Sequence, residues 1–216
     1  MYVILFFLYF LLCLSVLVRF VAQRYDFFQL FCNIRNNFTL LSLSLHRNLL
    51  NTIGMKPYDI NLVADYIILR LNSDERINLI NLKLQKLLYY LQAWSLGINE
   101  ERFLNCYFEA WVHGPVSREL YDRFKPTHSL YSFITISDIK NENPESMIEN
   151  SDIEFINFIL DNYAGFSGAE LETMTHKETP WIEARDGCMP MQSCERKISE
   201  ETMQKYYGER WHKING

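Results

Sequence analysis

Few residues in this chain could carry out chemistry, and they are widely spaced. Cys106 or Cys188 could act as a nucleophile if a histidine lay beside it, and His113 and His176 are the candidates. A thiol and an imidazole are the minimum composition for nucleophilic catalysis. A zinc site built from Cys106, His113 and His176 would have to be assembled by the fold, because no two of them stand at ligand spacing.

The spacings that define common catalytic, metal and phosphate sites are missing from the sequence. It contains no Cys-x-x-Cys, no His-Glu-x-x-His and no glycine-rich phosphate loop, and Cys188 and Cys194 are six positions apart with no close histidine. We therefore expect no catalytic residue, no cofactor and no metal ion, and a protein that is not an enzyme. The alternative is a hydrolase or nucleic-acid-modifying enzyme that uses Cys106, His113 or His176.

Composition and charge narrow the class of protein further. Hydrophobic residues make up 49% of the chain and charged residues 22%, as in a globular protein with a core. The net charge is -5, and residues 1–54, with four arginines and one aspartate, carry +3, which leaves -8 on the remainder. An acidic body disfavours a nucleic-acid partner. Five irregularly spaced cysteines predict reduced thiols in a cytoplasmic protein rather than a disulfide framework.

The N-terminal segment differs from the rest of the chain. Residues 2–18 form an apolar run interrupted only by Ser15, and Arg19 and Arg24 follow it. The run is at the lower limit of length for a membrane-spanning helix, and the arginines would keep the body cytoplasmic. Alternatively, the true start is Met55 and the upstream segment is not made, or the run packs on the body as an apolar helix. We divide the chain into an extension, 1–54, and a domain, 55–216.

Helices are predicted for most of the domain. Apolar residues recur at helical spacing from Ile60 to Leu71, with Asp59 as the N-cap. A second helix begins after Asn81 and ends near Gly97, with a buried leucine stripe. Its polar residues, which are expected to be solvated or to face a partner, are Lys83, Lys86 and Gln92.

The later elements are shorter. A strand or buried extended segment is predicted within 103–113, and Pro115 is placed at the first position of a helix that ends at Lys125. One short strand is expected at 131–139. Further helices are predicted at 156–163, from Ser167 or Gly168, at 180–185 and at 200–207, with Thr175 and Glu178 in capping-box spacing.

Three phrases stand out in order along the domain. The first phrase, residues 82–94, contains Leu84, Gln85, Lys86, Leu87, Tyr89, Tyr90 and Trp94. The second phrase, residues 109–121, contains Trp111, His113, Gly114, Pro115 and Tyr121. The third phrase, residues 171–185, contains Thr175, His176, Glu178, Pro180, Trp181 and Arg185. Large aromatics at 94, 111 and 181 are expected to be core anchors, and one of them could instead be an interface hot spot.

These phrases resemble the Panacea domain of SocA-like and GepA-like antitoxins over about Tyr58 to Tyr207. Met174 replaces the family's usual leucine. The resemblance implies a compact, mainly α-helical domain with at most one or two short strands, encoded on a prophage or other mobile element. It also implies an antitoxin that binds and neutralises a toxin protein encoded by a neighbouring gene. The alternative within the family is an adaptor that delivers its partner to a protease.

The resemblance assigns the phrase residues a structural or toxin-binding role. We expect the contact with the toxin around Trp111–Tyr121 and on the exposed side of the helix that carries Lys83–Gln92. No nucleic acid is expected as a partner, and a membrane would be one only if residues 2–18 are expressed.

Overall fold

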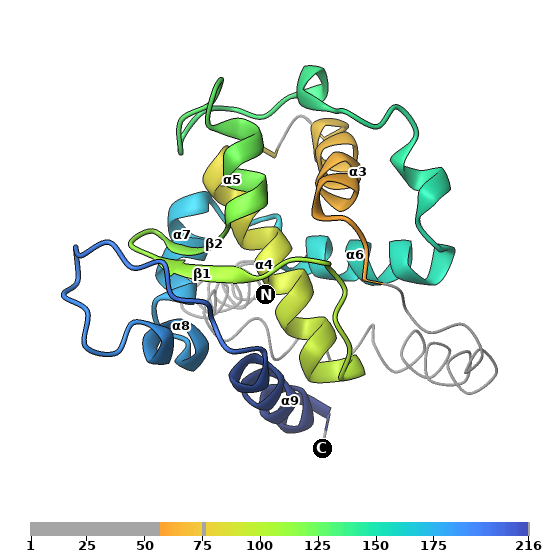
Figure 1. Ribbon diagram of the computed structural model, residues 1–216. Helices are drawn as coiled ribbons and strands as arrows, with labels where there is room; N and C mark the ends of the chain where they lie inside the picture. The colour runs from red at the N-terminus through yellow and green to blue at the C-terminus, as the bar shows by residue number, and fades with distance from the viewer. Residues whose placement is uncertain (1–56, 75–76, 216) are drawn as a thin grey trace, which may run out of the picture. The chain divides into compact units, whose positions relative to one another are not determined.

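The computed structural model of the protein describes residues 57–74 and 77–215. Helices dominate these residues, and the named strands form one two-stranded sheet (Figure 1). The prediction of a mainly α-helical domain with at most one or two short strands is confirmed. Residues 1–54, with the apolar run 2–18, and the candidate start at Met55 lie outside the described residues. Among the helices that are described, none has both the length and the apolar character needed to cross a membrane.

Helix α3, Ile60–Asn72, begins where the sequence predicts. The Asp59 carboxylate accepts hydrogen bonds from the backbone N–H groups of Asn61 at 2.6 Å and Leu62 at 3.4 Å. These two amides would otherwise lack a partner in the first turn, so Asp59 stabilises the helix start. The apolar face of α3 packs against the next helix, α4.

Helix α4, Asn81–Asn99, is the central element of the domain. Every residue from 81 to 96 is buried, and α3, α6, α7 and strand β2 pack around it (Figure 1). A helix that is buried on all sides belongs to the core rather than to the surface. It continues past Gly97, its predicted end, and stops at Glu100, which adopts a left-handed conformation with φ 59°.

Gly97 serves a close helix crossing instead of a helix end. A Cβ at this position would lie 2.6 Å from Cβ of Tyr207 and 2.8 Å from the backbone nitrogen of Gly208. Both of those residues belong to the last helix, α9, Glu200–Asn215, which also continues beyond its predicted end. The predicted ends at Gly97 and Gly208 are therefore wrong, because these glycines allow two helices to approach each other.

The sheet is a hairpin of β1, Phe108–Trp111, and β2, Gly114–Ser117. The strand expected within 103–113 is confirmed as β1. Pro115 lies in β2 opposite Ala110 rather than at a helix start, so that prediction is wrong. The Ala110 N–H donates away from β2, to the Arg196 carbonyl at 2.9 Å, so this pair requires no N–H from the proline.

The remaining elements surround α4 and the hairpin. Helix α5, Arg118–Phe124, ends before Pro126 as predicted. Residues 131–139 form no strand; they hold one bridge, Ile80 to Phe133, and a 3-10 helix, η1, Ile136–Asp138. After them come η2, Pro144–Met147, and the helices α6, Asn150–Tyr163, α7, Gly168–Thr175, and α8, Thr179–Ala184.

A capping box opens α7, but with different residues from those predicted. The Ser167 hydroxyl accepts from the Glu170 N–H at 3.2 Å, and the Glu170 carboxylate accepts from the Ser167 N–H at 2.8 Å. The start of α7 at Ser167 is confirmed. Thr175 is the last residue of α7, and its hydroxyl donates to the Glu172 carbonyl, so the expected pairing of Thr175 with Glu178 is wrong.

Candidate functional site

Two side chains of the first phrase cover the outer edge of β2. The Gln85 amide donates to the Ser117 carbonyl at 3.4 Å and accepts from the Ser117 N–H at 2.9 Å. The Lys86 ammonium donates to the Pro115 carbonyl at 3.1 Å. A strand edge has backbone groups that require partners when they are buried. Side chains of α4 therefore take the place of a third strand.

Lys86 is completely buried where all three phrases meet. Gly114, with φ 91°, lies so close that a Cβ there would be 2.7 Å from Lys86 Cε and 2.8 Å from Thr175 Oγ1. Burial lowers the pKa of Lys86 to about 7, and the charge of Glu172 acts in the opposite direction. The tight fit explains why a glycine stands before the proline, since a side chain would displace the lysine.

Two further polar residues of α4 are also buried. Lys83 donates to the Ala164 carbonyl at 2.7 Å, and the Gln92 side-chain oxygen accepts from the N–H groups of Phe103 at 3.0 Å and Leu104 at 2.7 Å. The prediction that Lys83, Lys86 and Gln92 are solvated or face a partner is therefore wrong. These side chains hydrogen-bond backbone groups of distant segments, so the expected partner-binding side of α4 is part of the core.

The third phrase covers the outer edge of β1. Arg185 donates to the Ala110 carbonyl at 2.9 Å, and Trp181 donates through its indole nitrogen to the Trp111 carbonyl at 3.1 Å. Residues 196–198 complete this edge, because the Ile198 N–H donates to the Phe108 carbonyl at 2.8 Å. The three phrases thus meet at the hairpin, and their polar groups fix both of its edges.

A second buried polar centre surrounds the Glu178 carboxylate. Tyr207 donates to it at 2.6 Å, Tyr90 at 3.4 Å and Arg210 at 3.2 Å. Burial raises the pKa of Glu178 to about 7, and the hydrogen bond from Tyr207 and the charge of Arg210 act to lower it. Glu178 therefore ties α9 to the core.

Aromatic rings extend this centre. Tyr90 stacks on Tyr163 with ring centroids 4.0 Å apart and planes at 17°, and Trp94 donates to the Tyr163 hydroxyl at 2.7 Å. Trp94 is the buried anchor that the sequence predicts. Sequence reasoning missed Tyr163, Tyr207 and Arg210. The one available signal was the spacing of Tyr207 and Arg210, which places them on the same face of a helix.

The two candidate histidines lie near each other beside α7. His113 bonds the Glu172 carboxylate through Nδ1 at 3.0 Å, and His176 stacks on Trp181 with centroids 4.1 Å apart. Burial lowers the pKa of His176, against the opposing charge of Glu172. Both imidazoles therefore make structural contacts, which fix the end of the hairpin and the start of α8.

Cys106 is buried, and burial raises the pKa of its thiol to about 12. Such a thiol is a poor nucleophile at neutral pH, because the thiolate is the reactive form. Within residues 57–74 and 77–215, no group of three or more cysteine, histidine, aspartate or glutamate side chains is arranged to hold a metal ion.

Three partly exposed residues of the second phrase form a small patch, here called the Trp111 patch: Trp111, Arg118 and Tyr121. The Arg118 guanidinium lies 4.7 Å from the Trp111 ring centroid, and the Tyr121 ring meets Trp111 edge-on at 4.7 Å. Arg118 also pairs with Glu109 at 2.9 Å and Glu195 at 2.8 Å. These pairs hold the patch in one arrangement. Trp111 and Trp181 are only partly buried, unlike Trp94.

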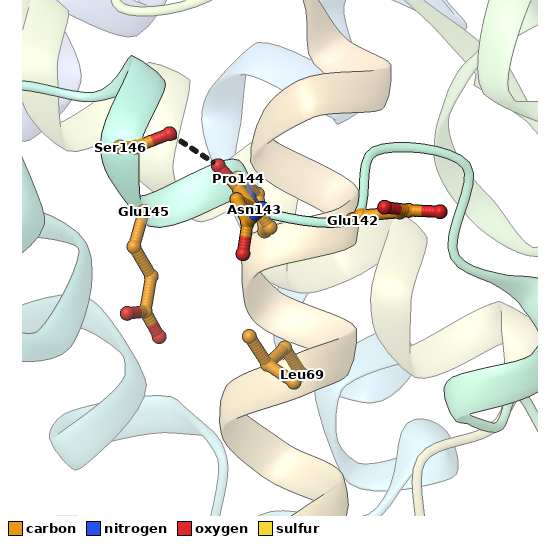
Figure 2. A pocket seen from close by; sticks show the side chains of 6 residues that line it. All are labelled: Leu69, Glu142, Asn143, Pro144, Glu145 and Ser146. Carbon is orange, nitrogen blue, oxygen red and sulfur yellow. Dashed lines mark hydrogen bonds between the residues drawn. The ribbon is translucent and has the colours of Figure 1, made fainter.

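One hollow lies away from the phrases, between α3 and η2. Leu69 and residues 142–146 line it, and the Ser146 hydroxyl donates within it to the Asn143 carbonyl at 2.8 Å (Figure 2). Figure 2 shows Glu142 pointing away from Leu69. No residue of the three phrases lines the hollow.

Comparison with known families agrees with this arrangement. Residues 84–182 match the model of the family described as Antitoxin SocA-like, Panacea domain. The matched stretch contains most of α4, the whole hairpin and the start of α8. The resemblance to the Panacea domain is therefore confirmed over residues 84–182, a shorter stretch than the range of about Tyr58 to Tyr207 that the sequence predicts. No curated protein and no solved structure matches the chain significantly.

Proposed function

We propose that this protein is an antitoxin that binds a partner toxin protein directly and blocks its action. The observation that carries the proposal is the match of residues 84–182 to the antitoxin family. In this proposal the protein is not an enzyme, and its Panacea domain is a scaffold for a binding surface. The burial of Gln85, Lys86 and Glu178 supports this division, because each of them hydrogen-bonds other parts of the domain.

The surface proposed for the toxin is the Trp111 patch. Tryptophan, tyrosine and arginine are the residue types that most often dominate binding energy at protein interfaces. The three side chains stand on β1 and α5, and both elements pack against β2, whose outer edge is bonded by side chains of α4. A rigid surface loses little conformational entropy when it binds, which favours affinity.

Co-expression tests the proposal. The full chain is expressed with the product of the adjacent gene, and growth is compared with that of cells carrying each gene alone. We expect the adjacent product to stop growth, this protein to restore it, and the two to co-purify. If the adjacent product is harmless, or is toxic and not rescued, the antitoxin proposal fails for that pair. If rescue comes with a shortened half-life of the toxin, delivery to a protease replaces direct blocking.

Two double variants locate the surface. Trp111→Ala with Tyr121→Ala removes the aromatic part of the Trp111 patch, and we expect rescue to be lost. The matched control is Tyr131→Ala with Phe133→Ala, which removes two aromatic residues that are 59% and 61% exposed elsewhere on the domain. Circular dichroism confirms that both variants fold. Rescue by the first variant and failure of the second would place the toxin on the 131–133 segment instead.

The non-enzymatic part of the proposal has its own test. We expect Cys106→Ala, His113→Ala and His176→Ala each to retain rescue whenever the variant folds. Loss of rescue in a folded variant that still co-purifies with the toxin would indicate chemistry at that residue.

A further inference from the structure

The loop between α8 and residues 196–198 is bonded from within by the Arg185 guanidinium. Arg185 donates through Nη2 to the carbonyls of Met189 at 3.1 Å, Pro190 at 3.2 Å and Gln192 at 2.8 Å. Gly187, with φ 76°, turns the chain into this loop. The guanidinium thus fixes the path of a segment that would otherwise be free to sample many conformations.

This path brings two cysteines together at the end of α8. The Cys188 N–H donates to the Arg185 carbonyl at 2.8 Å, and the Cys194 thiol lies 3.8 Å from the Ala184 carbonyl, which it can donate to. Both positions are therefore anchored to neighbouring residues. Both thiols are free, and Cys194 is near enough to raise the pKa of the Cys188 thiol. The sequence alone did not indicate this, because six positions separate the two residues.

We propose that Cys188 and Cys194 form an oxidant-responsive dithiol that closes to an intramolecular disulfide. With hydrogen peroxide as the oxidant, the Cys188 thiolate attacks one oxygen, the O–O bond breaks, and a sulfenic acid and water result. The Cys194 sulfur then attacks the Cys188 sulfur, the S–O bond breaks, and a second water leaves with the Cys194 proton. Two thiols are oxidised and one peroxide is reduced to two waters.

Exposure decides the order of the two steps. Cys188 is partly exposed, whereas Cys194 is 5% exposed, so an oxidant meets Cys188 first and Cys194 resolves the intermediate. The neighbouring Cys194 thiol raises the pKa of the Cys188 thiol, while the charges of Arg196 and Arg185 act to lower it. The reaction should therefore accelerate as the pH rises. This inference is independent of the antitoxin function.

Peptide mapping of the full chain provides the test. Trypsin cleavage after Arg185 and Arg196 releases one peptide, residues 186–196, that holds both cysteines, Met189 and Met191. The folded protein is treated with hydrogen peroxide, quenched, denatured, alkylated and digested. We expect the peptide to lose two hydrogens and to take up no alkyl group, and a reductant to reverse both changes. The thiol of Cys106 should react at least about tenfold more slowly, because it is buried and its thiol pKa is raised.

The methionines supply an internal measure of oxidant exposure. Met189 and Met191 are 74% and 79% exposed, and each can take up one oxygen. If the methionines are oxidised while both cysteines are still alkylated, the proposal is overturned. In Cys194→Ser we expect Cys188 to accumulate as a sulfenic acid that a dimedone probe traps. Fast disulfide formation by Cys188 with another cysteine of the wild-type chain would also overturn it.

Discussion

The side-chain amide of Gln85 forms two hydrogen bonds with the backbone of Ser117, one to its N–H at 2.9 Å and one to its carbonyl at 3.4 Å. A glutamine on a helix thereby presents to β2 the same donor and acceptor pair as a neighbouring strand would. Lys86, the next residue, bonds Pro115 on the same edge. An isolated two-stranded hairpin is only marginally stable in water. The bonds from Gln85 and Lys86 stabilise this hairpin by fixing it to the core.

Gln85→Leu removes both bonds and replaces the amide with an apolar side chain of similar size. The Ser117 N–H and carbonyl would then be buried without partners, and we expect the free energy of unfolding to fall by about 1–3 kcal/mol. Urea denaturation followed by circular dichroism measures the change. Glu154→Ala, at an exposed position of α6, is the control and should change stability by no more than about 0.5 kcal/mol. Equal stability of Gln85→Leu and wild type would contradict the role given to this amide.

Lys86→Met tests the buried ammonium through the pH dependence of stability. Burial lowers the pKa of Lys86 in the folded protein to about 7 from an ordinary 10.5. Between pH 7 and 10.5 the unfolded chain binds more protons at this residue, so its contribution to stability rises with pH, by at most about 1.4 kcal/mol per pH unit. We expect this slope in wild type and its loss in Lys86→Met. Parallel stability curves for the two proteins over this range would show that the pKa of Lys86 is not lowered in the folded protein.

Glu178→Gln tests a pH dependence of stability that has the opposite sign to that of Lys86 and occurs at lower pH. The folded-state pKa of Glu178 is raised to about 7 from 4.5, so the folded protein binds more protons at this residue between pH 4.5 and 7. Its contribution is fully present below pH 4.5 and is lost as the pH rises through 7. Wild type loses this contribution as the pH rises across the window, and Glu178→Gln does not. We therefore expect the variant to become more stable relative to wild type. Glu209→Gln, at an exposed position of α9, is the control and should follow wild type throughout.

Gly97→Ala tests the crossing of α4 and α9. The added methyl would lie 2.6 Å from Tyr207 Cβ and 2.7 Å from its backbone carbon, so α9 must shift. We expect a loss of about 1–3 kcal/mol, which is typical of an overpacked core, although alanine itself favours a helix. Near-ultraviolet circular dichroism should change as well, because Trp94 and Tyr207 lie in edge contact at 4.9 Å. Gly165→Ala is the matched control, because no atom lies within 4 Å of its added Cβ; an equal loss in both variants would rule out a steric cause.

The sequence by itself determined the elements that depend on residues close together in the chain. The helical spacing from Ile60 to Leu71 and the Asp59 cap predicted α3 correctly, since a cap bonds amides two and three residues away. The three phrases predicted the resemblance to the Panacea domain correctly, since residues 84–182 match the model of that family. The apolar stripe of α4 also predicted a helix at the right start.

The tertiary structure decided what the polar residues do. Lys83, Lys86 and Gln92 are polar at positions off the apolar stripe, and a periodicity argument places them in water. They are buried because backbone groups of Ala164, Pro115, Phe103 and Leu104, which stand between 11 and 81 positions further along the chain, lie at the right distance to bond them. The same holds for Gly97, Glu178 and the Cys188–Cys194 pair. Their roles depend on tertiary contacts between separate segments of the chain. The spacing of residues along the sequence does not show which segments make those contacts.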